Sequence, residues 1–221
     1  MNRKALARKF DHTLLKSDAS LKNIKSLCTE AKKYNFRSIC INPIWLESAS
    51  TIIKQSNIKL CTVVGFPLGA ITSKIKLVEL DYSIDNGASE VDMVMNIGLF
   101  KDKKYQYVKK EISDIVKKCN NRIIVKVIVE AGLLDQKELR VATNIVEDSG
   151  ADFIKTSTGF SSFGATKKNI EIIKNNIKSN LKIKASGGIN SLSQVIELLS
   201  LGVDIIGSSS SAIIMEELNE N

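Results

Sequence analysis

The most constraining feature of this sequence is a pattern in which a short apolar run is followed by a segment with helical periodicity, repeated eight times along 221 residues. The apolar runs, which we expect to form strands, cover residues 10–13, 38–41, 60–64, 90–95, 123–129, 153–155, 181–184 and 203–206. Regular alternation of strands and helices predicts a parallel sheet, because each helix carries the chain back before the next strand begins. Eight such units in about this length favour closure into a TIM (β/α)8 barrel over an open doubly wound sheet.

The segments between the runs carry helix signals at their ends. Ser20 is a typical N-terminal cap, and the segments that end at Asn86 and Ser149 are each followed by a glycine. The expected helices cover residues 21–34, 45–55, 73–86, 105–119, 135–149, 165–177 and 192–200, and a last one begins after the turn at 207–210. A Rossmann sheet would carry GxGxxG after its first strand, and this sequence does not. With two prolines and 12 glycines no linker is evident, so we expect a single domain over residues 1–221.

The net charge of +8 raises the question of nucleic-acid binding. The lysines are scattered over many helical segments and interleaved with acids, and aromatic residues that could stack on bases make up only 5% of the chain. Solvated helix faces therefore explain the charge better, and we expect no nucleic-acid partner. A positive field would still favour an anionic substrate.

The cysteines and the single histidine, His12, do not form a metal-binding pattern. Cys28, Cys40, Cys61 and Cys119 show no CxxC spacing. Cys40 and Cys61 lie in apolar runs and are interpreted as buried thiols, which fits a reducing, cytoplasmic location. No long apolar stretch follows the basic N-terminus, so neither a signal peptide nor a membrane span is expected.

A lysine ends the sixth expected strand. Phe153 and Ile154 lead directly into Lys155, and small polar residues follow. An ammonium group is costly to bury, so such a lysine is paired, solvated or neutral, and a neutral one can attack a carbonyl group. Taken alone, a lysine that ends a strand and reaches solvent is the commoner case.

Other charged residues fall near the ends of the expected strands, where TIM barrels place their active sites. Asp11, Asp92, Lys155 and Lys184 all fall there, together with the glycine and serine turns after the last two strands. Asp92, Lys126 and Lys184 lie within otherwise apolar strands, where a charge needs a partner of opposite sign. We therefore expect these side chains to converge on one site, with Lys155 as a functional residue.

Five motifs at these positions resemble those of the deoxyribose-phosphate aldolases, a class I family with a TIM-barrel fold. They are DHTLLK at 11–16, VVGFPLG at 63–69, EVDMV at 90–94, FIKTSTG at 153–159 and IKASGGI at 183–189. Their order and spacing extend the resemblance over nearly the whole chain. It implies a lyase that reversibly cleaves 2-deoxy-D-ribose 5-phosphate to D-glyceraldehyde 3-phosphate and acetaldehyde.

By this resemblance, Lys155 is the Schiff-base nucleophile, and Asp92 and Lys184 transfer protons. An iminium at Lys155 accepts the electrons of the broken carbon–carbon bond as an enamine, so we expect no metal and no cofactor. A cation at Lys184 would favour the neutral amine of Lys155 by like-charge repulsion. His12 is expected to be structural, because this chemistry leaves it no necessary role.

The resemblance and the barrel fold together indicate a phosphate site in the turns after the last strands. The expected substrate- or phosphate-binding residues are Gly159, Gly188, Ser209, Ser210 and Asp11, the last through a sugar hydroxyl or by orienting Lys184.

The chain also departs from the family pattern. Ile205 and Ile206 stand where many relatives carry a basic residue, which would weaken phosphate binding, and Phe163 stands where glycine is usual.

Alternatives remain open at this stage: another Schiff-base aldolase or a transaldolase, a non-catalytic barrel that binds a sugar phosphate, or a nucleic-acid-binding protein. The expected partners are small phosphosugar and aldehyde substrates, and a second copy of the chain in a homodimer.

Overall fold

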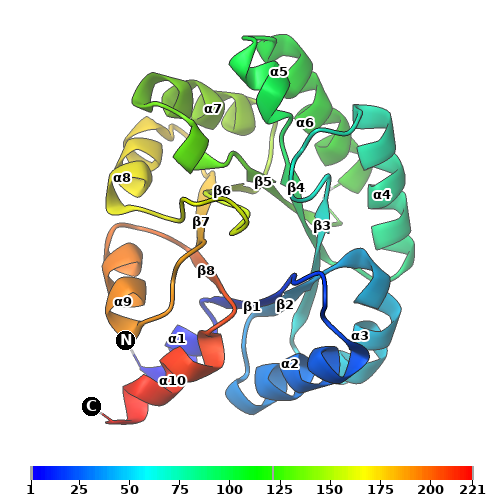
Figure 1. Ribbon diagram of the computed structural model, residues 1–221, viewed down its shortest axis with the longest axis vertical. Coiled ribbons are helices and arrows are strands. Elements are labelled where there is room, and N and C mark those ends of the chain that lie inside the picture. Colours follow the sequence, from blue (N-terminus) through cyan, green and yellow to red (C-terminus); the bar gives the residue numbers. More distant parts are fainter. Residues whose placement is uncertain (1, 121, 221) are drawn as a thin grey trace.

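Eight parallel strands close into a barrel in sequence order, and helices surround it (Figure 1). The structure is a computed structural model that describes residues 2–120 and 122–220. The strands are β1 (Phe10–Leu14), β2 (Ser38–Ile41), β3 (Lys59–Val64), β4 (Glu90–Val94), β5 (Ile124–Ile128), β6 (Phe153–Lys155), β7 (Lys182–Ser186) and β8 (Ile205–Ser208). The predicted α/β TIM barrel is therefore confirmed. Residues 1, 121 and 221 of the expected single domain lie outside the described residues.

The helices follow the strands as the sequence predicts. They are α1 (Arg3–Ala7), α2 (Leu21–Tyr34), α3 (Leu46–Ile53), α4 (Ser73–Asp85), α5 (Ile97–Lys101), α6 (Tyr105–Cys119), α7 (Gln136–Asp148), α8 (Lys167–Asn176), α9 (Leu192–Ser200) and α10 (Ser211–Glu220), with 3₁₀ turns η1 (Pro43–Trp45) and η2 (Ala131–Leu133). Neither α1 nor α5 was predicted from the sequence. Each has five residues, too few to show a helical period.

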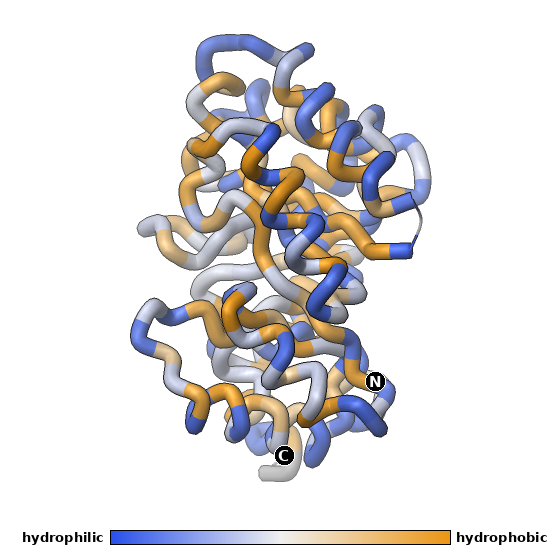
Figure 2. Tube along the Cα trace, turned by 90° about the vertical axis from the view of Figure 1, so that its right-hand side faces the viewer, coloured by the Kyte–Doolittle hydropathy of each residue, from blue (hydrophilic) through white to orange (hydrophobic). Residues whose placement is uncertain are grey.

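Local chemistry explains where several helices begin and end. Ser20, Asp135 and Ser191 open α2, α7 and α9 with capping boxes, in which the cap side chain and the third helical residue satisfy each other's backbone N–H groups. Asn35 ends α2 in the left-handed conformation, with φ of 56°. Figure 2 shows hydrophobic and hydrophilic residues interleaved along the helical parts of the chain, as expected for helices that bury one face against a barrel.

The barrel strands are buried on both faces, so they read as continuous apolar runs with charges only at special positions. Every residue of β2 and β4 is buried, including Asp92. In the described ranges, no helix is both long and apolar enough to cross a membrane.

The last two strands end later than predicted. Ala185 pairs with Ile206, and His12 pairs with Ser208, so β7 and β8 continue into residues that were expected to form turns. A glycine suits this part of β8, because a Cβ atom at Gly207 would lie 3.0 Å from Cε of Lys184.

Candidate active site

Charged side chains from five strands meet inside the barrel, four of them from positions within their strands and one, Lys155, from the end of its strand. Asp11 comes from β1, Asp92 from β4, Lys126 from β5, Lys155 from β6 and Lys184 from β7. Four of them are 0% exposed, and Lys155, the last residue of β6, is 2% exposed. The three residues predicted to be catalytic are thus brought together, at positions separated by as many as 92 residues.

Asp92 lies at the centre of this group. Its Oδ2 accepts hydrogen bonds from Nζ of Lys155 at 2.7 Å and from Nζ of Lys184 at 2.6 Å. Its Oδ1 accepts one from Nζ of Lys126 at 2.9 Å. One carboxylate therefore fixes the positions of three lysines, and Lys126 is the third cation considered from the sequence.

Two further acids complete the cluster. Asp11 accepts a hydrogen bond from Lys184, so that lysine contacts both Asp11 and Asp92. Glu90 lies 2.7 Å from Lys126, and both its oxygens accept from the guanidinium of Arg37, at 2.5 and 2.8 Å. The pair Glu90–Arg37 was not predicted, because neither residue lies at a C-terminal strand end.

The charges of the cluster balance when one lysine is neutral. The acids are Asp11, Glu90 and Asp92, and the basic groups are Arg37, Lys126, Lys155 and Lys184. The cluster therefore contains one basic group more than it contains acids. Of its three lysines, Lys155 is the one that also lines a cavity.

Burial and neighbouring charges have opposite effects on the pKa values of Asp92 and Lys184. Burial would raise the pKa of Asp92, but its three lysine neighbours outweigh burial and hold the pKa well below the usual value. Burial would lower the pKa of Lys184, but Asp11 and Asp92 raise it well above the usual value. At neutral pH Asp92 is therefore a carboxylate and Lys184 a cation.

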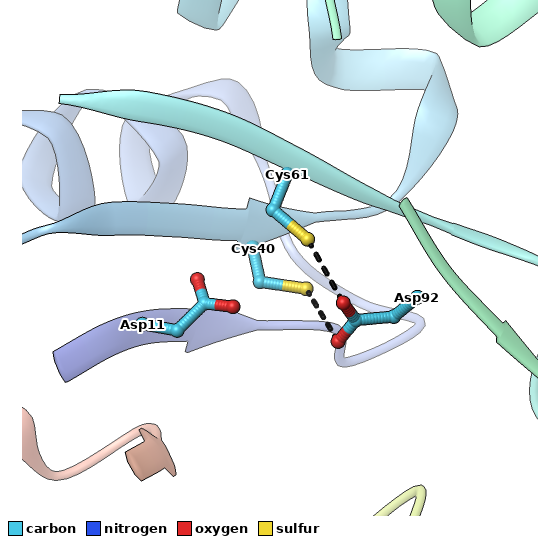
Figure 3. A group of neighbouring side chains, drawn as sticks. All are labelled: Asp11, Cys40, Cys61 and Asp92. Carbon is cyan, nitrogen blue, oxygen red and sulfur yellow. Dashed lines mark hydrogen bonds between the residues drawn. The ribbon is translucent and has the colours of Figure 1, made fainter. Parts of the chain in front are cut away.

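Two thiols contact the same carboxylate, and four donor groups lie within 4.8 Å of one another (Figure 3): Asp11, Cys40, Cys61 and Asp92. The thiol of Cys61 donates to Oδ1 of Asp92 at 3.2 Å, and that of Cys40 lies 3.9 Å from Oδ2. Burial raises the pKa of Cys61 well above its usual value, so it stays a neutral donor. Three of the four carboxylate oxygens are bound by lysines, which leaves little room for a metal ion. The absence of a metal remains a prediction.

A cavity of about 470 Å³ opens above the cluster. Its lining includes Lys155 together with Gly159, Gly188, Ser209 and Ser210, the residues expected to bind phosphate. The volume is typical of small-ligand sites. Asp11 does not line the cavity; it is fully buried in the barrel interior, where it contacts Lys184. Of its two expected roles, the geometry supports the orientation of Lys184 rather than contact with a sugar hydroxyl.

Glycine and serine turns from β7 and β8 form one side of this cavity. Gly188 has φ of +72°, and open space surrounds the position of its missing Cβ, so its backbone is accessible to a ligand. Ser208 donates from its hydroxyl to the carbonyl of Ile189 at 2.7 Å and ties the two turns together. Ser210 follows at the N-terminus of α10, where backbone N–H groups and the helix dipole favour an anion.

Glu130 is a buried acid that the sequence analysis missed, although it follows β5 at the same end of the barrel. Its carboxylate accepts from the backbone N–H and the hydroxyl of Thr158, at 3.1 and 2.5 Å, and from the hydroxyl of Ser161 at 2.9 Å. These bonds hold the loop that follows Lys155. Phe163 in that loop packs on Gly132, where a Cβ would lie only 2.2 Å from the phenylalanine Cβ.

His12 lies outside the cavity lining. Its Nε2 is 2.9 Å from Oε2 of Glu30, and its ring packs against Phe36 with centroids 5.0 Å apart. Burial lowers the pKa of His12 and outweighs the opposing effect of Glu30. These contacts support the structural role expected from the sequence.

Comparisons with known proteins agree with this geometry. The model of the family described as DeoC/LacD family aldolase matches residues 5–203. A deoxyribose-phosphate aldolase from Mycoplasmoides pirum is 52% identical over 216 residues, covering 96% of this chain and 97% of the relative. One from Clostridium kluyveri is 45% identical over 211 residues, with coverage of 96% and 97%. The tetrameric deoxyribose phosphate aldolase from Aeropyrum pernix superposes with a TM-score of 0.91 at 34% identity, over 99% of this chain and 92% of the other. Fold, buried lysine cluster and sequence together show that this chain is an aldolase of the DeoC/LacD family.

Proposed function

We infer that this aldolase cleaves 2-deoxy-D-ribose 5-phosphate to D-glyceraldehyde 3-phosphate and acetaldehyde, reversibly, through a Schiff base on Lys155. The observation that carries the proposal is the position of Lys155. Of the three lysines bonded to Asp92, it is the one that lines the cavity. The proposed substrate is supported by two relatives that are named deoxyribose-phosphate aldolases.

The reaction follows from these positions. The free amine of Lys155 attacks C1 of the open-chain aldehyde, and loss of water gives an iminium. The 3-hydroxyl then loses its proton, the C2–C3 bond breaks, and its electron pair moves into the iminium as an enamine. Glyceraldehyde 3-phosphate leaves. Protonation of the enamine carbon and hydrolysis of the new iminium release acetaldehyde and restore the amine.

Asp92 and Lys184 are the proposed proton-transfer residues. Asp92 contacts Nζ of Lys155 directly and can receive or return protons there, through a bound water where the reacting carbon is farther away. Lys184 contacts the same carboxylate oxygen, so a proton leaving one lysine is compensated by the other. Asp11 keeps Lys184 in place.

Reduction with borohydride tests the nucleophile directly. The protein is incubated with deoxyribose 5-phosphate or with acetaldehyde, reduced and digested, and the adduct is mapped by mass spectrometry. The expected result is an adduct on Lys155. An adduct on Lys126 or Lys184 would show that the nucleophile is misassigned. A protein that binds the sugar phosphate but gives no adduct would be a non-catalytic barrel.

Replacing Lys184 with leucine is expected to move the acid limb of the pH–rate profile to higher pH. With one cation fewer beside Asp11 and Asp92, the amine of Lys155 gives up its proton less readily. The measurement is kcat/KM against pH, or the pH dependence of borohydride trapping if turnover is slow. Lys182→Leu is the matched control, because Lys182 begins the same strand and is exposed. An unshifted profile in Lys184→Leu would show that Lys184 does not tune the nucleophile.

A homodimer is the proposed assembly. Ile75, Val78 and Tyr82 are 48%, 57% and 46% exposed and lie three and four residues apart on α4, so they form an apolar outer face. Burial of this face against a second copy would remove it from water. Sedimentation equilibrium gives the number of subunits, and a monomeric mass at assay concentration would exclude the dimer.

The buried cysteines, none of which forms a disulfide bond, support a reducing, cytoplasmic location.

A further inference from the structure

The cavity needs a cation at its phosphate end. A phosphate monoester carries about −1.5 to −2 charges at pH 7. The turns with Gly188 and Ser210 offer N–H and hydroxyl groups, which carry only partial charges. Ile205 and Ile206, where a basic residue was expected from the resemblance, are buried and do not line the cavity. A full positive charge at the phosphate would therefore come from another residue.

Among the described residues, two lysines line the cavity, Lys155 and Lys16, and no acidic residue does. Lys155 is bonded to Asp92 and is the group that attacks the carbonyl carbon in the proposed reaction. Lys155 therefore contacts the aldehyde end of the substrate, opposite the phosphate. Lys16 is the remaining cation in the lining.

The topology places Lys16 next to the serine turn. β1 pairs with β8, with Asp11 opposite Gly207 and His12 opposite Ser208, so the chain that leaves β1 emerges beside Ser209 and Ser210. Lys16 is the second residue after the end of β1. Although distant in sequence, the two loops line the same cavity.

The backbone around Lys16 is fixed by its neighbours. The carbonyl of Leu15 accepts a hydrogen bond from Nδ2 of Asn42 at 3.2 Å, and the Leu15 side chain is buried against Cys40, Cys61 and Val63. The carbonyl of Lys16 accepts from the backbone N–H of Ala19 at 3.2 Å. The Lys16 side chain itself is exposed, and within residues 2–120 and 122–218 no acidic side chain forms an ion pair with it. Its charge is thus available to a ligand.

We propose that Lys16 binds the 5-phosphate of the substrate and sets the preference for phosphorylated over unphosphorylated sugars. This inference rests on the proposed aldolase function and adds a residue to it. The substrate would extend between two lysines: its aldehyde carbon at Lys155 and its phosphate at Lys16 and the serine turn.

The test compares deoxyribose 5-phosphate with 2-deoxyribose as substrates of Lys16→Gln, Lys16→Arg and the wild type. Lys16→Gln is expected to lower kcat/KM for the phosphorylated sugar about 10- to 100-fold, the usual effect of losing a charge-assisted hydrogen bond. The loss should appear in KM, with kcat nearly unchanged, because the phosphate is bound equally before and during the reaction. Turnover of 2-deoxyribose should stay within about twofold, and Lys16→Arg should retain most of the preference.

Lys22→Gln is the matched control. Lys22 is an exposed lysine on α2 that does not line the cavity, so its removal changes the net charge equally. If Lys16→Gln has no more effect than Lys22→Gln, or lowers kcat/KM for both sugars alike, Lys16 does not bind the phosphate.

Calorimetric titration with inorganic phosphate separates this proposal from the proposed function. If the wild type does not cleave deoxyribose 5-phosphate, the aldolase proposal fails. Weaker phosphate binding by Lys16→Gln than by Lys22→Gln would still support Lys16 as the phosphate ligand. Equal binding by the two variants would refute it.

Discussion

Replacing Lys155 with alanine is expected to lower kcat for cleavage of deoxyribose 5-phosphate by about 10⁴-fold or more, the scale on which enzymes lose activity with their covalent nucleophile. Without the amine there is no iminium to accept the electrons of the C2–C3 bond. The fold should persist, because Lys155 opens to the cavity and Asp92 keeps its bonds to Lys126 and Lys184. Steady-state kinetics and a thermal melt measure the two quantities, and substantial residual turnover would contradict the assignment.

A pair of arginine variants separates the amine from its charge. Lys155→Arg and Lys126→Arg each retain a cation bonded to Asp92, but only the first removes the proposed nucleophile. Borohydride trapping should therefore fail in Lys155→Arg and persist in Lys126→Arg. Loss of trapping in both would indicate that the geometry around Asp92, rather than the amine, limits the reaction.

The barrel could be predicted because both of its signals are local. Parallel strands buried on two faces are continuous apolar runs, and the helices between them have capping residues such as Ser20 and Asp135. The ends of β7 and β8 could not be predicted, because Ser186 and Gly207 are typical turn residues. They belong to strands here because they pair with each other across β7 and β8, and that pairing depends on the closed barrel rather than on residue type.

The convergence of Asp92, Lys155 and Lys184 could be predicted from one rule, that TIM barrels place functional residues at strand ends. The rule does not predict whether a side chain lines the cavity or is buried in the barrel interior. Asp11 was expected among the substrate-binding residues, yet it is buried against Lys184 and does not line the cavity. Lys16 satisfies the same rule, but an exposed lysine after a strand is so common that its sequence context alone does not distinguish it.

Replacing Asp92 with asparagine is expected to be the most damaging change to the cluster. The variant leaves three buried lysines without the carboxylate that they share, and removal of one partner from a buried ion pair costs about 3–5 kcal/mol of unfolding free energy. Loss of its proton-transfer role should also lower kcat by about 10²- to 10⁴-fold. Urea denaturation and kinetics measure the two effects. Asp114→Asn, which breaks the exposed Lys110–Asp114 pair, is the control, with an expected cost below about 1 kcal/mol.

The pH dependence of this stability difference has a definite sign. The pKa of Asp92 is depressed in the folded protein, so its contribution is fully present above the ordinary value of 3.8 and is lost as pH falls through the lower, folded-state value. The pKa of Lys184 is raised, so its contribution is present below the ordinary value of 10.5 and is lost only as pH rises through a still higher value. Between these limits the unfolding free energy of the wild type should exceed that of Asp92→Asn by a constant amount. This difference should shrink in strong acid, as the wild-type carboxyl group takes up a proton. A margin that disappears near neutral pH would mean that Asp92 is not the carboxylate that holds the three lysines in the folded state.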